Sequence, residues 1–474
     1  MKTYPLYLNG EFVASEPAWD VINPATGAAF ARISTVDRRR VAQALTDAHA
    51  AFAGWRQLTA KARGEYLRRI AAEVERRRDE IARLISSENG KPLAQSLGEV
   101  GMTVDHLQWF AEEGRRAYGR IIPPQAAGKR NLVVKTPIGV VGAISPWNFP
   151  LVLAVRKLAP ALAAGCTVVL KPARQTPLSC IAFAECAHAA QLPKGVLQVL
   201  CGQSNEIGQE FLSNPLCRKV TFTGSTEVGR ALIRGAAETI KPLSLELGGN
   251  APLLVFEDAD LKVAVEGALL AKMRNTGQSC IASNRLLVHR PVYQRFLDAF
   301  VAGVKALKVG EFSEPGVEIG PLIDEAAFKH ALAMVQEAVK RGARVLCGGR
   351  QIPRQGFFLE PTVLADVPAD SRCLHEEIFA PIAPVTAFDT EEEGIRLANA
   401  TEYGLSAYAF TRDASRVFRL ADSLEAGSIG INDGLPTTSN APFGGVKQSG
   451  WGRELGSEGL DAFLETKHVS LGMS

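Results

Sequence analysis

The stretch that decides the fold runs from Ile138 to Leu170 and reads IGVVGAISPWNFPLVLAVRKLAPALAAGCTVVL. Its first seven residues, Ile138–Ile144, are small or apolar and are typical of a buried strand. An apolar helix is expected over Leu151–Ala163, and a second buried strand over Cys166–Leu170. Short apolar strands separated by a helix indicate a βαβ unit, and therefore a mostly parallel sheet in an α/β fold.

The same alternation continues on both sides of this stretch. Toward the N-terminus, apolar residues at near-helical spacing predict one long amphipathic helix over Ala60–Glu88, ended by Gly90 and Pro92. Toward the C-terminus the expected elements are a helix over Leu178–Ala190, strands over Val196–Leu200 and Lys219–Thr223, and a second α/β series from Pro252 with helices over Asp260–Arg274 and Val292–Leu307. No repeat or low-complexity linker interrupts the pattern, so we expect interleaved domains.

Composition excludes several classes of function. The chain has 474 residues, 53 Lys+Arg and 50 Asp+Glu, a formal net charge of +3, so nucleic acid is not an expected partner. With 46% hydrophobic and 22% charged residues it is typical of a globular protein. No signal peptide follows Met1, and no stretch is apolar enough for a membrane span. The eight cysteines lack C-x-x-C spacing, which favours reduced thiols, a cytoplasmic location and no metal site.

Two local patterns suit a bound cofactor and an activated water. The strand before Gly224 and Ser225 enters a small-residue turn and then a helix, whose free N–H groups suit a pyrophosphate. Glu246 stands between two leucines before Gly248 and Gly249, in apolar surroundings that raise a carboxyl pKa toward the range of a general base. Taken alone, the turn is equally typical of a purely structural turn, and Glu246 is more typical of a paired structural glutamate at a strand end.

Two more patterns suit attack on a carbonyl. Cys280 follows a glycine turn and polar neighbours, as a thiolate nucleophile can. Asn148 lies between Trp147 and Phe149 with a proline on either side, so its amide is a rigid donor for an oxyanion. A buried small cysteine and an ordinary turn are the alternatives that these patterns leave open.

In order and content, these motifs resemble the NAD(P)-dependent aldehyde dehydrogenase superfamily. The resemblance runs from end to end of the chain, and further matching motifs are Asn23–Gly27, Glu376–Phe379, Pro442–Gly450 and Gly452–Glu454. It implies a Rossmann-type cofactor domain from residues 1–117 and 138–247 and an α/β catalytic domain from 248–445. A small β arm from 118–137 and 446–474 is implied as an oligomerisation element, giving a homodimer or homotetramer.

The resemblance also implies the roles of the catalytic residues. Cys280 would attack the aldehyde, and Asn148 with the Cys280 N–H would hold the oxyanion. Glu246 would activate water to hydrolyse the thioester. Lys157 and Glu454 match positions that assist proton movement in relatives. Ala282 stands where some relatives have a second cysteine, so a local disulfide switch is not expected.

The residues that match cofactor-binding positions are Trp147, Lys171, Pro172, Ala173, Arg174, Gly224, Ser225, Leu247, Glu377 and Phe379. Among them Arg174 bears on the choice of cofactor. Relatives that strongly prefer NAD have a glutamate there, which bonds the ribose hydroxyls and repels a 2′-phosphate. A cation at this position attracts that phosphate instead, so we expect NADP to be preferred and NAD to remain possible.

Two arginines narrow the substrate. Arg156 and Arg274 flank the Asn148 and Cys280 motifs, and both positions resemble succinate-semialdehyde dehydrogenases. Two cations there would hold the far carboxylate of a semialdehyde. Thr437 aligns with a serine near that carboxylate in the subfamily, but the preceding Pro436 is a departure that leaves chain-length preference open.

Succinate semialdehyde is therefore the expected substrate, with glutarate semialdehyde or a broader range of aldehydes as the alternatives. Rival functions are a CoA-acylating enzyme, a cofactor-free thiol esterase and a catalytically silent structural protein. The first commonly lacks the glutamate base. The last would be expected to lose Cys280, Asn148 or Glu246.

Overall fold

The stretch Ile138–Leu170 forms the centre of an eight-stranded sheet in the computed structural model, which describes residues 1–473. β8 (Val140–Ile144) pairs in parallel with β9 (Thr167–Lys171), and α5 (Pro150–Ala164) connects them. On its other side β8 pairs in parallel with β11 (Cys217–Thr223). The chain therefore continues to one side of β8 and later returns to the other, and in such sheets ligands bind at the carboxyl ends of the strands near that point.

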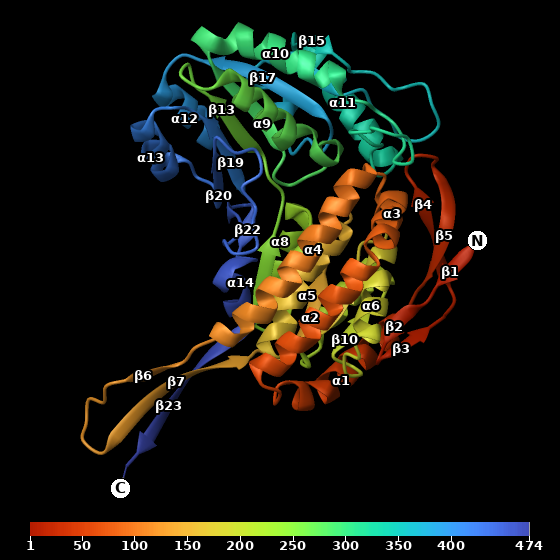
Figure 1. The fold of residues 1–474 in the computed structure, drawn as a ribbon, viewed down its shortest axis with the longest axis vertical. Helices are drawn as coiled ribbons and strands as arrows, with labels where there is room; N and C mark the ends of the chain where they lie inside the picture. The colour runs from red at the N-terminus through yellow and green to blue at the C-terminus, as the bar shows by residue number, and fades with distance from the viewer. Residues whose placement is uncertain (474) are drawn as a thin grey trace.

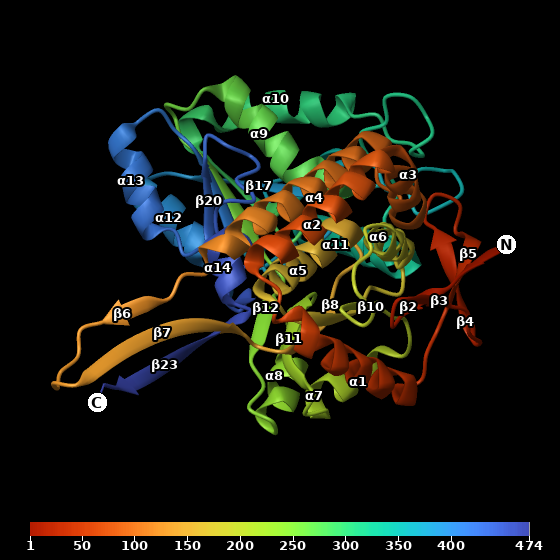
Figure 2. The same cartoon turned by 60° about the horizontal axis from the view of Figure 1, so that its bottom comes forward.

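The order of this first sheet is β22-β12-β11-β8-β9-β10-β2-β3. Its remaining strands are β2 (Leu6–Leu8), β3 (Glu11–Val13), β10 (Leu197–Val199), β12 (Leu243–Glu246) and β22 (Gly450–Trp451). Figure 2 shows α1, α7 and α8 on one side of it and α2, α4, α5 and α6 on the other. These helices are α1 (Arg38–Trp55), α2 (Ala60–Arg76), α4 (Leu93–Glu113), α6 (Leu178–Ala189), α7 (Ser204–Ser213) and α8 (Thr226–Ala237). Every residue of α5 is buried, as expected for a helix that is apolar all round.

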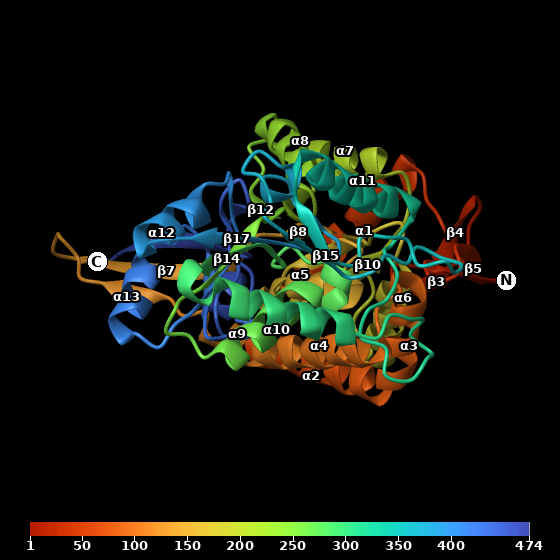
Figure 3. The same ribbon diagram turned by 90° about the horizontal axis from the view of Figure 1, so that it is seen from above.

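A second sheet of seven strands, in the order β15-β16-β17-β14-β13-β19-β20, follows in the chain. Its strands are β13 (Ala251–Val255), β14 (Ser283–His289), β15 (Arg344–Cys347), β16 (Thr362–Ala365), β17 (Ile382–Phe388), β19 (Ser406–Phe410) and β20 (Ser428–Ile431). Leu253 and Val255 pack with α9 (Leu261–Met273) and α10 (Tyr293–Ala306), whereas Leu254 packs with α12 (Glu391–Asn399) and α13 (Ala414–Ser423). Figure 3 shows these two pairs of helices apart from each other. Alternate residues of the strand thus fill two separate cores, one on each face.

Three strands form an arm that extends away from both sheets (Figure 1). β7 (Lys129–Pro137) pairs antiparallel with β6 (Arg120–Ile122) on one side and with β23 (Leu464–Gly472) on the other. The remaining elements are β1 (Lys2–Tyr4), β4 (Ala18–Asn23), β5 (Ala28–Ser34), β18 (Tyr403–Gly404), β21 (Val446–Lys447), α3 (Arg78–Asn89), α11 (Glu325–Arg341) and α14 (Gly456–Asp461). β21 pairs with β18 and β22 with the first sheet, so the arm strand itself begins only at Leu464.

The α/β alternation predicted from the sequence is confirmed, but the single helix predicted over Ala60–Glu88 is wrong. α2 ends at Arg76 and α3 begins at Arg78, because Arg77 leaves the helical region at φ −102° and ψ 18°. The Arg77 guanidinium pairs with Glu185 of α6, 2.7 Å away. The apolar spacing continues across this break, so periodicity does not reveal it.

No helix within residues 1–473 combines the length and the apolar character that a membrane crossing requires.

Candidate active site

One narrow cavity brings together the predicted nucleophile and the predicted substrate residues. Its volume is about 40 Å³, and its lining residues are Met102, Phe149, Val152, Leu153, Arg156, Arg274, Ser279, Cys280, Ile281, Leu435, Thr437 and Phe443. They come from α4, from α5, from the turn before β14 and from the loop after β20. Arg156, Arg274 and Thr437 therefore share one cavity with Cys280, although up to 281 residues of sequence separate them.

A strained turn carries Cys280 into this cavity. Asn275 and Thr276 both adopt left-handed backbone angles, with φ of 52° and 59°. The Gly248–Gly249 loop packs directly against the turn, since a Cβ on Gly249 would lie 2.2 Å from the Cys280 carbonyl oxygen. Burial raises the pKa of the Cys280 thiol to about 12, and the charges of Glu377 and Glu246 add to the shift while Arg156 opposes it. The surroundings of Cys280 therefore disfavour its thiolate form.

Asn148 lies beside the same turn. Its side-chain nitrogen donates a hydrogen bond to the carbonyl oxygen of Gln278, at 3.2 Å, and the residue is buried. A carboxamide nitrogen has two N–H groups, so one remains for a second acceptor. The geometry suits a donor for an oxyanion formed two residues further on, at Cys280.

A buried group of charges lies behind Cys280. Lys157 donates a hydrogen bond to the Thr223 hydroxyl, at 2.6 Å, and pairs with Glu454. Glu246 is also buried, and its Oε2 atom has no hydrogen-bond partner among residues 1–473. Burial raises the pKa of Glu246 well above its usual range, and the neighbouring Glu454 raises it further, while Lys157 lowers it. The upward shift expected from the sequence is thus present.

The two arginines of the cavity contact aromatic rings rather than carboxylates. The Arg156 guanidinium lies 4.8 Å from the centre of the Phe443 ring, and that of Arg274 lies 4.9 Å from the Phe149 ring. The Arg156 Nε atom is buried without a hydrogen-bond partner, and within residues 1–473 neither guanidinium forms an ion pair. Burial lowers the pKa of both groups. The cavity is therefore a cationic, apolar-walled site in which no carboxylate of residues 1–473 bonds either guanidinium directly. The charges of Glu454 near Arg156 and of Glu99 near Arg274 still act on them and oppose the lowering of their pKa.

A second, larger cleft of about 780 Å³ opens at the carboxyl ends of β8, β9 and β11. The residues predicted to bind cofactor that line it are Trp147, Lys171, Ala173, Arg174, Gly224 and Ser225. The N-terminus of α8 points into it, and Ser225 caps that helix by accepting from the Val228 N–H at 3.3 Å. Exposed helix N–H groups at the switch point of a parallel sheet suit a dinucleotide pyrophosphate, so these residues fit the group.

Arg174 occupies the open part of this cleft. Its side chain is exposed, and its guanidinium lies 4.7 Å from the ring centre of Trp19, a residue of β4. No ion pair in the described part of the chain, residues 1–473, includes Arg174. Trp19 could not be singled out from the sequence, because nothing in its local pattern indicates that β4 lies beside a cleft that residues 144–235 form.

Four further residues predicted to bind cofactor lie outside the lining of this cleft. The Phe379 ring packs edge-on against Trp147 at 5.3 Å, and Glu377 accepts a hydrogen bond from the Gly249 N–H at 3.0 Å. Pro172 accepts one from the Lys171 ammonium, and Leu247 packs in the small cluster under α8. Phe379 and Glu377 therefore lie between the cleft and the turn that carries Cys280.

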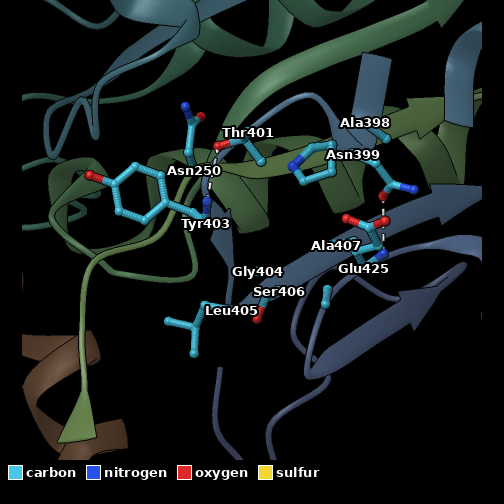
Figure 4. Close-up of a pocket in the computed structure, with 12 residues that line it drawn as sticks. Asn250, Ala398, Asn399, Thr401, Tyr403, Gly404, Leu405, Ser406, Ala407 and Glu425 are labelled. Atoms are coloured by element: carbon cyan, nitrogen blue, oxygen red, sulfur yellow. Dashed lines mark hydrogen bonds between the residues drawn. The ribbon is translucent and has the colours of Figure 1, made fainter. Parts of the chain in front are cut away.

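Figure 4 shows a different pocket, between β13 and the segment from Thr401 to Ala407. Its volume is about 10 Å³, enough for roughly one water molecule. None of the residues predicted from the sequence to form a site lines it. The pocket is therefore separate from the site around Cys280.

Comparison with known proteins agrees with this geometry. Residues 12–469 match the aldehyde dehydrogenase family. The chain is 48% identical over 468 residues to the NADP(+) succinate-semialdehyde dehydrogenase of Escherichia coli strain K12, covering 98% of this chain and 97% of that protein. It is 47% identical over 468 residues to a glutarate-semialdehyde dehydrogenase of Pseudomonas aeruginosa, covering 98% and 97%.

A solved structure of succinate-semialdehyde dehydrogenase from Burkholderia pseudomallei superposes with a TM-score of 0.97 at 47% identity, covering 99% of this chain and 98% of that one. The match in sequence and in fold extends over both large sheets and the arm. The chain therefore belongs to the aldehyde dehydrogenase family and is an enzyme of NAD(P)-dependent aldehyde oxidation.

Proposed function

We propose that this enzyme oxidises aldehydes that carry a carboxylate, succinate semialdehyde first, and that it prefers NADP. One observation carries the proposal: two guanidinium groups, Arg156 and Arg274, line the cavity of Cys280 without a carboxylate partner in residues 1–473. Leaving a buried charge uncompensated is costly, and a substrate carboxylate would supply the missing partner through charge-assisted hydrogen bonds. The relatives named above act on semialdehydes of this kind, which supports the choice.

In the proposed reaction Cys280 releases its proton to solvent, and its sulfur attacks the aldehyde carbon. The carbonyl oxygen becomes an oxyanion, which the free N–H of Asn148 and the Cys280 backbone N–H stabilise in the resulting thiohemiacetal. The dinucleotide supplies the hydride acceptor, and loss of hydride leaves a thioester on Cys280. Glu246 then takes a proton from water, and the resulting hydroxide attacks the thioester. The products of this step are the carboxylate and the Cys280 thiol. Lys157 and Glu454 would relay that proton away from Glu246.

The cofactor would lie in the cleft at the ends of β8, β9 and β11. The N-terminus of α8, with Gly224 and Ser225, would hold the pyrophosphate, and Lys171 would lie near the ribose. Arg174 would pair with the 2′-phosphate, which supports NADP over NAD. The E. coli relative is likewise named as an NADP(+) enzyme.

Glutarate semialdehyde is the second candidate. Thr437 lines the cavity behind Pro436, and a shift of this loop would change the length of substrate that fits between Cys280 and the arginines. The relative from P. aeruginosa, named for that substrate, is about as similar to this chain. The presence of Glu246, Asn148 and Cys280 favours hydrolytic dehydrogenation over transfer to CoA, over cofactor-free esterase action and over a silent structural role.

The arm and the domain division are part of the same proposal. The first sheet would form the cofactor domain, the second sheet the catalytic domain, and β6, β7 and β23 an oligomerisation arm. Tyr118 and Ile121, at the start of the arm, are more than two-thirds exposed, which supports contact with a second copy in a homodimer or homotetramer. Eight free cysteines support a reducing, cytoplasmic location.

The proposal is tested by measuring kcat/KM for succinate semialdehyde, glutarate semialdehyde and butanal, each with NADP and with NAD and without CoA. We expect kcat/KM for each semialdehyde to exceed that for butanal by about 100-fold. A single hydrogen bond to a charged group can contribute a factor of this size. We also expect NADP to exceed NAD. Butanal as good a substrate as the semialdehydes would overturn the substrate assignment.

A further inference from the structure

The backbone carbonyl of Asn148 receives an unusual number of hydrogen bonds. The Lys91 ammonium donates to this oxygen at 2.7 Å and the Asn275 amide at 2.9 Å, and the Asn89 amide approaches it at 3.4 Å. A carbonyl oxygen has two lone pairs, so three donors share them. Asn275 belongs to the turn that carries Cys280, whereas Asn89 and Lys91 lie where α3 meets α4. The carbonyl thus joins two separate parts of the chain beside the reacting atoms.

Lys91 is held in place by a second buried charge. Its ammonium pairs with Glu99 of α4 at 2.7 Å, and both side chains are fully buried. The other oxygen of Glu99 accepts the backbone N–H groups of Leu151 and Val152, at 2.9 and 3.2 Å, at the start of α5. One carboxylate therefore fixes both Lys91 and the first turn of the helix that carries Arg156 and Lys157.

The local backbone brings Lys91 to this position. Gly90 has a φ of +89°, and a Cβ there would lie 2.6 Å from the Pro321 ring, so only glycine fits at this corner. The Lys91 ammonium also lies 3.9 Å from the centre of the Phe149 ring, whose surroundings include the Arg274 guanidinium. Lys91 thus contacts two consecutive residues, Asn148 and Phe149, that belong to the proposed oxyanion donor and to the cavity wall.

We propose that Lys91, fixed by Glu99, is a positioning residue that aims the Asn148 side chain at the oxyanion. An ion pair kept only for packing would need no bond to this carbonyl, and neither charge touches the cavity of Cys280. Because Lys91 would act through Asn148, removing it should slow steps that form an oxyanion and leave cofactor affinity unchanged. The proposal rests on the role of Asn148 in the proposed function.

A double-mutant cycle on Lys91→Met and Asn148→Ala tests this coupling. The rate measured is acylation of Cys280 by p-nitrophenyl acetate with no dinucleotide present, alongside the burst of reduced cofactor with succinate semialdehyde. We expect Lys91→Met to slow both the acylation and the burst by about tenfold or more. This loss is smaller than the loss of about 10²–10³-fold expected when an oxyanion donor is removed outright. In the Asn148→Ala background the same change should have less than a twofold effect, and Lys91→Arg should restore part of the rate.

Glu88→Gln is the matched control. Glu88 is equally buried, three residues from Lys91, and accepts the N–H groups of Leu178 and Ser179 of α6 instead. This variant should lower the melting temperature without changing either rate. If Lys91→Met does not fold, Lys91→Met/Glu99→Gln removes both buried charges and is measured in its place.

The outcomes separate the two proposals. If the double variant loses acylation rate by the product of the two single losses, the two residues act independently. That result would overturn the positioning role of Lys91 and leave the proposed function intact. An Asn148→Ala variant that acylates at the wild-type rate would instead overturn the oxyanion assignment itself. If Glu88→Gln lowers the acylation rate as much as Lys91→Met does, any disturbance of the packing where α3 meets α4 slows the enzyme. That result would also overturn the positioning role.

Discussion

The Asn148 side chain donates a hydrogen bond across 3.2 Å to the carbonyl oxygen of Gln278, two residues before Cys280. This bond uses one N–H of the amide and fixes the direction of the other. Asn148 follows β8 of the first sheet and Cys280 precedes β14 of the second, so the bond joins the two parts of the proposed site. Its geometry accounts for how a side chain from position 148 can serve a reaction at position 280.

Replacing Asn148 by Ala should lower kcat by about 10²–10³-fold, because one donor to the developing oxyanion is lost. KM for succinate semialdehyde should change little, since the donor acts mainly in the transition state. Steady-state kinetics with saturating NADP measure both. A higher KM with an unchanged kcat would assign Asn148 to substrate binding instead.

Glu246→Gln should block release of the acid while leaving formation of the thioester possible. The amide cannot accept a proton from water, so deacylation should fall by about 10²–10⁴-fold. Rapid mixing with excess semialdehyde should give one equivalent of reduced cofactor per site, and mass spectrometry should find an acyl group on Cys280. Absence of both the burst and the acyl group would place Glu246 before hydride transfer.

The charges around Glu246 should move the pH dependence of deacylation in opposite directions. Glu246 must be ionised to act as a base, so the rate falls as the pH falls through its raised pKa. Glu454 raises that pKa, and Glu454→Gln should therefore move the falling limb to lower pH. Lys157 lowers it, so Lys157→Met should move the limb to higher pH. Shifts of the same sign in both variants would contradict this electrostatic account.

Arg174→Glu should reverse the preference for cofactor. A carboxylate at this exposed position repels a 2′-phosphate and can accept bonds from ribose hydroxyls, so kcat/KM with NADP should fall by about tenfold or more. The value with NAD should hold or rise. Arg39→Glu, an equally exposed change outside the lining of the cleft, is the matched control and should alter neither. If kcat/KM falls equally with NADP and with NAD, Arg174 does not determine the choice of cofactor.

The sequence predicted the parts of the fold that follow from a single period of hydrophobicity. The run from Ile138 to Leu170 is mostly apolar, and its strand, helix and strand are confirmed within one or two residues at each end. Periodicity does not predict the break at Arg77, because a change in the backbone of one residue leaves the apolar spacing intact. The resemblance identified Arg156, Arg274 and Thr437, and the structure brings all three to one cavity.

Features that depend on long-range contacts were not predictable. Nothing near Lys91 or Glu99 in the sequence distinguishes them from solvated charges, yet both side chains are fully buried, and Lys91 bonds the Asn148 carbonyl. Trp19 likewise meets Arg174 only through the fold. The raised thiol pKa of Cys280 likewise follows from surroundings that the fold supplies and not from its neighbours in sequence.

The most direct test of the central claim compares two substrates in wild-type enzyme and in Arg274→Ala. The quantity is kcat/KM for succinate semialdehyde divided by that for butanal, which lacks the carboxylate but has the same carbon chain. Loss of a charge-assisted contact should reduce this ratio by about 10- to 100-fold, through KM for the semialdehyde, while butanal is oxidised almost as before. A variant in which both substrates lose equally, with the ratio unchanged, would contradict the claim that the arginines of this cavity bind a substrate carboxylate.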